Sequence, residues 1–150
     1  SLHMIPGGTR VDSLPLEQVI TKCKVLDLSS CVDKITASDL KDKDINEDDF
    51  ILLKTRNSFE DILEGDFIYV DDSGAEYLRD KKIKGVGIDS LGIERNQPEH
   101  PTHVKLLEAD IVILEGLCLK KIEEGEYFLF AAPIYVPDAE AAPVRAVLLR

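Results

Sequence analysis

The chain has 150 residues with 18 basic and 29 acidic side chains, a net charge of −11, and 44% hydrophobic residues. This composition is typical of one globular domain, spanning residues 1–150, with a full hydrophobic core. Nucleic-acid binding requires clustered Lys and Arg, so the acidic balance argues against a nucleic-acid partner. No apolar run approaches the ~20 residues of a membrane helix, and residues 1–4 lack the basic and apolar regions of a signal peptide.

The cysteines give no sign of a metal or disulfide framework. Cys23, Cys31 and Cys118 are odd in number and show no C-x-x-C spacing. This pattern argues against a zinc knuckle or a redox motif and favours a reducing, cytoplasmic environment. Because Cys118 lies between two leucines, we expect it to pack in the core.

Short runs of strand-forming residues recur along the chain. We expect strands, in chain order, at residues 24–28, 50–55, 67–70, 84–88, 111–114, 127–136 and 144–149. Several of these runs are continuously apolar rather than alternating, which is typical of strands buried on both faces.

Helical segments lie between these runs, and two of them begin with a capping pattern. Ser73 and Glu76 form a capping box, which predicts a helix from there to about residue 80. Thr36 and Asp39 form a weaker version of the same pattern.

Two further short helices are expected. One lies at residues 15–21, and the other at 101–108 carries His103 on its first turn. Pro101 suits that first turn because its missing N–H would be unpaired there anyway. Since strands outnumber these short helices, we predict a mixed α/β domain dominated by a mixed β-sheet. The sequence has no G-x-G-x-x-G, P-loop or G-x-S-x-G motif, which argues against a nucleotide cradle or a nucleophile elbow.

One segment near the start combines glycines, a threonine and an acid. Residues 6–12 have the sequence PGGTRVD. This segment resembles the H-x-G-T-H-x-D signature of the cyclase family of metal-dependent hydrolases, whose best-known member is kynurenine formamidase. Pro6 and Arg10 stand where the family has ligand histidines, and the catalytic histidine that follows in the family has no counterpart after Asp12.

The resemblance extends over nearly the whole chain. Residues 85–90 (GVGIDS) are similar to the family's G-I-D-T/S segment, and residues 103–107 (HVKLL) to its H-x-x-L-L. Four further segments resemble strands of the family, namely residues 25–28, 51–55, 132–133 and 142–146. The family's portion ahead of the metal motif has no counterpart here. The resemblance implies the family's swivelling β/β/α fold, assembled as a dimer or tetramer.

The resemblance also implies three metal ligands. Asp12 corresponds to the bridging carboxylate, and His103 and Glu115 correspond to ligands of the second metal. These side chains offer one nitrogen and carboxylate oxygens to an ion, with open positions for water. Because the first-metal histidines are absent, we expect at most one divalent ion, zinc or manganese. A metal-free cleft is an equal alternative.

Accessory residues surround this predicted set. Arg10 cannot ligate a metal and places a fixed positive charge beside Asp12 or Glu115, either of which it would pair with. Thr9 belongs to the turn, and His100 is an accessory ligand or an exposed side chain. Glu115 ends an apolar strand, where an unpaired charge is costly, so a metal or an Arg10 ion pair would serve it equally.

Two functions fit these residues. The first is an amide (C–N) hydrolase of the arylformamidase type, weakened or inactive because three of the family's histidines are absent. The alternative is a non-catalytic binding or assembly protein on the same scaffold, in which Arg10 forms an anion pocket or an ion-pair core. In either case we expect a small amide or carboxylate as ligand and a cytoplasmic homo-oligomer, and we expect neither nucleic acid nor membrane as a partner.

Overall fold

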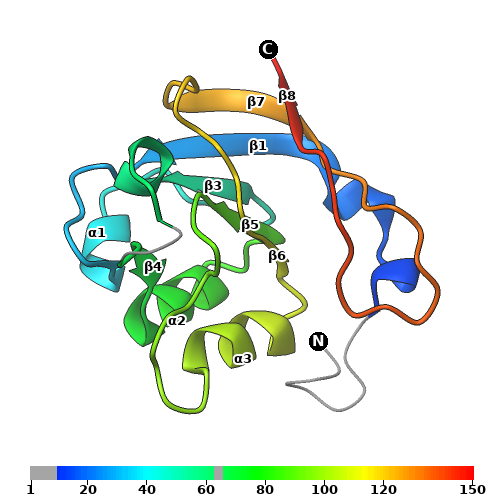
Figure 1. Ribbon diagram of the computed structural model, residues 1–150, viewed down its shortest axis with the longest axis horizontal. Helices are drawn as coiled ribbons and strands as arrows, with labels where there is room; N and C mark the ends of the chain where they lie inside the picture. The colour runs from blue at the N-terminus through cyan, green and yellow to red at the C-terminus, as the bar shows by residue number, and fades with distance from the viewer. Residues whose placement is uncertain (1–9, 63–65) are drawn as a thin grey trace.

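A six-stranded mixed sheet forms the centre of the protein (Figure 1). The computed structural model describes residues 10–62 and 66–150. The strand order is β6-β5-β3-β1-β7-β8. The first four strands are parallel to one another, β7 pairs antiparallel with β1, and β8 pairs antiparallel with β7. The strands are β1 (Ile20–Asp27), β3 (Phe50–Lys54), β5 (Gly85–Ile88), β6 (Val112–Leu114), β7 (Gly125–Phe130) and β8 (Val147–Leu149).

The α-helices are few and short, and they lie on one face of this sheet (Figure 1). They are α1 (Ala37–Leu40), α2 (Asp72–Asp80) and α3 (Pro101–Glu108). A small second sheet pairs β2 (Lys34–Ile35) with β4 (Tyr69–Val70) in parallel. Three 3-10 turns complete the described elements: η1 (Val11–Ser13), η2 (Leu16–Gln18) and η3 (Arg56–Phe59). The predicted mixed α/β class with few short helices is therefore confirmed.

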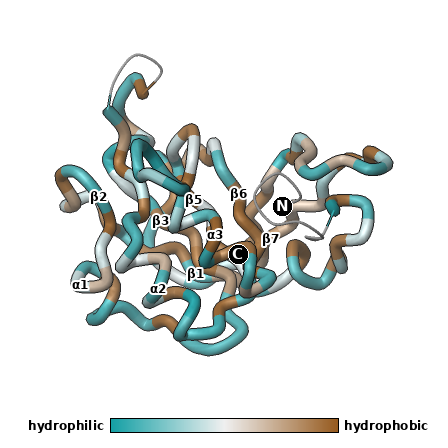
Figure 2. The backbone as a smooth tube through the Cα atoms, turned by 90° about the horizontal axis from the view of Figure 1, so that it is seen from below, coloured by the Kyte–Doolittle hydropathy of each residue, from teal (hydrophilic) through white to brown (hydrophobic). Residues whose placement is uncertain are grey.

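The core consists of two hydrophobic clusters, one on each face of the sheet. On β3, Ile51 and Leu53 belong to the cluster under the helices, whereas Phe50 and Leu52 belong to the cluster on the opposite face. Side chains of a strand alternate between faces, so a strand that is buried on both sides must be apolar throughout. Figure 2 shows these hydrophobic stretches along the middle of the molecule, with hydrophilic residues mainly on the surrounding loops.

Several predicted boundaries differ from the structure. The helix expected at residues 15–21 is wrong: only η2 forms, and β1 begins at Ile20 because this end of the strand pairs with Phe130 and Leu129 of β7. The strand expected at 127–136 ends at Phe130, before Pro133, which has no N–H to donate to a ladder. The strand expected at 144–149 is shorter and is preceded by Pro143.

The two capping predictions have different outcomes. The Asp39 carboxylate accepts hydrogen bonds from the Thr36 N–H and hydroxyl, so the capping box of α1 is confirmed. In α2 the helix is confirmed but its cap is not Ser73. Asp71 is the N-cap, since its carboxylate accepts the Gly74 N–H at 3.0 Å, and the Ser73 hydroxyl donates to that same carboxylate.

The three cysteines differ in their burial. Cys23 and Cys31 are buried, and this burial raises the pKa of each thiol to about 11. Cys118 is exposed, so the expectation that it packs in the core is wrong. The strand before it ends at Leu114, and in the irregular segment that follows it is Leu119 that points into the core. Among the described residues, no helix has the length and hydrophobicity needed to cross a bilayer.

Candidate metal-binding site

The candidate site lies at the carboxyl edge of the parallel strands. Glu115 directly follows β6, and the loop 89–100 leaves the neighbouring strand β5 at the same edge. α3 then runs back toward the start of β6, so its first turn, with His103, stays at this edge. In open α/β sheets, the carboxyl edge is where ligands usually bind.

The His103 ring lies between two carboxylates. Its Nε2 atom is 3.4 Å from Oε1 of Glu115, and its Nδ1 atom is 2.7 Å from Oε2 of Glu94. Burial by itself lowers the pKa of His103, but the hydrogen bonds and charges of the two glutamates outweigh it and raise that pKa. Burial likewise raises the pKa of Glu115, but His103 and the Ile93 N–H lower it overall.

A cavity of about 870 Å³ opens beside this pair. His103 and Glu115 contribute to its wall, and most of the remaining lining is aliphatic, including Leu107, Ile113 and Val144. Binding sites for small molecules are typically concave and apolar, with a few polar groups that set the orientation of the ligand. The His103–Glu115 pair is placed to be such a polar group.

The spacing of this pair fits a divalent ion. Two ligands of a tetrahedral ion with bonds of ~2.1 Å lie ~3.4 Å apart, which is the Nε2–Oε1 distance. A charge-assisted hydrogen bond is shorter, at about 2.7–2.9 Å. A carboxylate on the opposite ring nitrogen, as Glu94 provides, is the usual partner of a metal-bound histidine. His103 and Glu115 are therefore suited to hold a metal.

A second compact group shares His103. Ligand atoms of Glu94, His100 and His103 lie within 4.8 Å of one another. The Glu94 carboxylate, however, already accepts hydrogen bonds from Gln97, from the backbone N–H groups of Thr102 and His103, and from the His103 ring. With its oxygens engaged in this way, Glu94 acts as a support for His103 and not as a ligand.

Asp12 lies in a different set of contacts. Its Oδ2 atom accepts the Asp138 N–H at 3.0 Å, and its Oδ1 atom is 3.5 Å from Nε of Arg10. Oδ1 is buried and accepts no hydrogen bond from the described residues. No hydrogen bond or ion pair within the described ranges joins Asp12 to His103 or Glu115.

Only some of the residues predicted for the metal site come together in the structure. His103 and Glu115 come together as expected, whereas Arg10 pairs with Asp12 and Asp138 and not with Glu115. His100 has a 62% exposed side chain, with its Nδ1 3.7 Å from Glu94. Thr9 and Pro6 lie outside the described residues. Sequence reasoning missed Glu94, because no motif or regular spacing marks an acid in this irregular loop.

Comparisons with known proteins place the chain in a family. A profile of the Cyclase family matches residues 1–95, which is more than half of the chain. The chain belongs to the Cyclase family. This finding confirms the resemblance to the family.

Individual members of the Cyclase family are similar over nearly the full chain. A kynurenine formamidase of Bordetella avium is 30% identical over 149 residues, which are 98% of this chain and 71% of that protein. A solved structure of a potential metal-dependent hydrolase with cyclase activity is 49% identical, with a TM-score of 0.95 over 98% of this chain and 73% of the other. An isatin hydrolase bound to thioisatinate, 23% identical, shares the fold with a TM-score of 0.80 over 93% of this chain and 63% of its own.

Proposed function

We propose that this protein is a metal-dependent hydrolase of amide C–N bonds, of the arylformamidase type, with one zinc or manganese ion at His103 and Glu115. The observation that carries the proposal is the 3.4 Å spacing between His103 Nε2 and Glu115 Oε1 on the wall of the cavity. The similarity to kynurenine formamidases and to a metal-dependent hydrolase supports the reaction class.

Each group in the cavity has a role in this proposal. A divalent ion, when bound, supplies a Lewis acid and lowers the pKa of a water molecule. His103 and Glu115 would hold the ion, and Asp12, whose Oδ1 atom lacks a hydrogen bond but which does not lie within 4.8 Å of both, would have to move toward them to be the proposed third ligand. The aliphatic wall, including Leu107 and Val144, binds the hydrocarbon part of an aromatic amide and excludes water.

We further propose that this activity is weak. The positions of the family's two first-metal histidines hold Pro6 and Arg10, and the family's catalytic histidine has no counterpart. General acid–base catalysis typically contributes ~10²–10⁴-fold to a rate. A chain without that histidine should therefore turn over slowly, with metal and substrate binding largely retained.

The test is metal content together with hydrolysis of an N-formyl arylamine. The protein loaded with zinc or manganese should hold about one ion per chain. His103→Ala and Glu115→Gln should each release the ion and abolish hydrolysis, because each removes a ligand. His100→Gln is the matched control, since this side chain is 62% exposed. Metal retention by both ligand variants would contradict the proposed site.

One observation favours the non-catalytic alternative. Arg10 bonds to Asp138 and lies 3.5 Å from Asp12, so it forms an exposed ion pair at a position where the family has a first-metal histidine. Under this alternative the cavity binds a small ligand without hydrolysing it. Stoichiometric metal binding with measurable, His103-dependent turnover favours the hydrolase, whereas absence of metal and turnover together favours the binding protein.

A further inference from the structure

The residues Ile93 and Glu94 support both members of the metal-binding pair. The Ile93 N–H donates to Oε1 of Glu115 at 2.7 Å, and Oε2 of Glu94 lies 2.7 Å from Nδ1 of His103. Two adjacent residues of one loop therefore set the positions of the carboxylate that follows β6 and of an imidazole on α3.

The Glu94 carboxylate is held rigidly. Its side chain is 1% exposed, and both of its oxygens accept hydrogen bonds. Two of its donors are the backbone N–H groups of Thr102 and His103 in the first turn of α3, which have no partner within the helix. The N-terminus of α3, the positive end of the helix dipole, therefore faces the Glu94 side chain next to the His103 ring.

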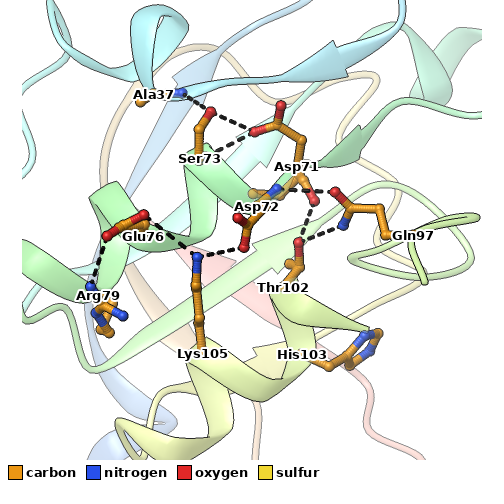
Figure 3. A network of polar contacts seen from close by, with 12 residues as sticks. Ala37, Asp71, Asp72, Ser73, Glu76, Arg79, Gln97, Thr102, His103 and Lys105 are labelled. Atoms are coloured by element: carbon orange, nitrogen blue, oxygen red, sulfur yellow. Dashed lines mark hydrogen bonds and ion pairs between the residues drawn. The ribbon is translucent and has the colours of Figure 1, made fainter. Parts of the chain in front are cut away.

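Gln97 extends this support to α2. Its side-chain N–H groups donate to Glu94 at 2.7 Å and to the Thr102 hydroxyl at 2.8 Å, and its Oε1 accepts the Asp72 N–H at 3.0 Å. The Thr102 hydroxyl donates in turn to the Val70 carbonyl at 2.8 Å. Figure 3 shows the contacts of Gln97 with Asp72 and Thr102 between the starts of α2 and α3, and His103 beside Thr102 on α3.

The backbone of the same loop adopts an unfavourable conformation. Asn96, Glu99 and His100 have φ values of 51°, 66° and 51°, in the left-handed region that non-glycine residues rarely adopt. Such conformations persist where surrounding contacts determine them, and they cluster at functional sites. Here they bring Glu94 and Gln97 back onto the first turn of α3.

We propose that Glu94 is a positioning residue that selects the metal-binding tautomer of His103. Glu94 accepts a hydrogen bond from a proton on Nδ1, and this arrangement leaves the lone pair of Nε2 free to bind the ion. Among the described residues, the other acid facing the ring is Glu115 on the Nε2 side, so without the Glu94 carboxylate the proton would move to the nitrogen that must bind the metal. This inference rests on the proposed function, since it concerns the same ion.

The first experiment needs no substitution. Among the chain's three histidines, His103 can be assigned in the imidazole ¹⁵N NMR spectrum with the aid of His100→Gln. In the metal-free protein, at a pH where the ring is neutral, we expect the proton on Nδ1. A proton on Nε2 overturns the proposal, whether or not the protein binds metal.

The second experiment compares Glu94→Gln with Glu99→Gln. Both variants lose one carboxylate from the same loop, but Glu99 is exposed. In Glu94→Gln we expect the proton to move to Nε2 and the affinity for zinc, measured by competition with a chelator, to fall ~10–100-fold. Glu99→Gln should match the wild type in both measurements.

The outcomes distinguish this inference from the proposed function. If the wild type binds zinc and Glu94→Gln binds it equally well, the positioning role is wrong and the metal site stands. If the wild type binds no zinc but the tautomer moves in Glu94→Gln, the positioning role stands and the hydrolase proposal falls. Should Glu94→Gln fail to fold, the wild-type spectrum alone decides.

Discussion

At the scale of single residues, several acids of this chain accept hydrogen bonds at the ends of structural elements. Asp39 and Asp71 cap α1 and α2, and Glu94 accepts N–H groups at the start of α3. Asp89, 1% exposed, accepts backbone and hydroxyl hydrogen bonds from Thr55. The net charge of −11 is therefore not only a solvated surface, because part of it organises turns and helix starts.

The contribution of the Asp71 cap to stability can be measured through its pH dependence. Burial tends to raise its pKa, but hydrogen bonds from Ser73 and Gly74 and the ion pair with Lys34 lower it below 3.8. A carboxyl with a lowered folded-state pKa stabilises the protein above the unfolded value and loses this effect as the pH falls below it. We expect Asp71→Asn to reduce the free energy of unfolding at pH 7 by ~0.5–1 kcal/mol, and we expect this difference to shrink as the pH falls below the unfolded value.

Urea unfolding of wild type and Asp71→Asn between pH 2.5 and 7 measures this difference. Asp80→Asn, at the exposed C-terminal end of α2, is the charge-matched control and should change the free energy of unfolding by less than ~0.5 kcal/mol. A difference between wild type and Asp71→Asn that stays constant down to pH 2.5 would show that the lowered pKa is absent.

The site residues differ in how far they could be predicted. His103 and Glu115 were accessible because they belong to a family motif with characteristic spacing. Glu94 was not, since its contact with His103 depends on a loop with left-handed residues that no periodicity describes. The contact of Arg10 with Asp138 joins residues 128 positions apart, and the sequence alone could not choose between Asp12, Asp138 and Glu115 as its partner.

At the scale of elements, close packing between strands constrains small residues. Gly85 on β5 lies opposite Phe50 on β3, and a Cβ atom at Gly85 would overlap the Phe50 ring. Phe50 is fully buried, so its ring has no free space to move into. We expect Gly85→Ala to lower the free energy of unfolding by ~1–3 kcal/mol, as measured by chemical denaturation.

A double-mutant cycle separates this overlap from a loss of backbone freedom. Phe50→Leu removes ring atoms, so Gly85→Ala should cost less in that background than in the wild type. Equal costs in both backgrounds would mean that the Phe50 ring is not responsible.

The elements themselves were largely predictable from local pattern. Apolar runs marked β3 and β5 because both faces of these strands are buried, and Pro101 marked the start of α3. The helix predicted for residues 15–21 does not form because pairing of the start of β1 with β7 overrides a short local helical tendency. Ser73 failed as a cap because Asp71, two positions earlier, is the better-placed acceptor.

At the scale of the whole molecule, contacts between residues 10–12 and 138–139 hold one wall of the cavity. Arg10 bonds to Asp138, the Val11 N–H donates to the Ala139 carbonyl at 3.0 Å, and the Asp138 N–H donates to Asp12 at 3.0 Å. The next residues, 140–142, line the cavity. This group of contacts therefore positions a wall segment that has no regular secondary structure.

Removing the Arg10 charge should loosen this wall without unfolding the protein. In Arg10→Gln we expect faster amide hydrogen exchange in residues 134–146, with at most ~1 kcal/mol lost from global stability because the ion pair is exposed. Arg79→Gln is the matched control, since Arg79 also pairs with two carboxylates, on α2. Unchanged exchange in residues 134–146 of Arg10→Gln would show that backbone contacts alone hold the wall.

The position of β1 in the sheet has a consequence for biosynthesis. Its neighbour β3 leaves the ribosome soon after it, but its other neighbour, β7, ends only at Phe130. At typical elongation rates, a delay on the order of ten seconds separates the two. During that interval the nascent chain carries an open strand edge that can pair with other chains. Chaperone protection of β1 during translation would prevent such pairing until β7 has been made.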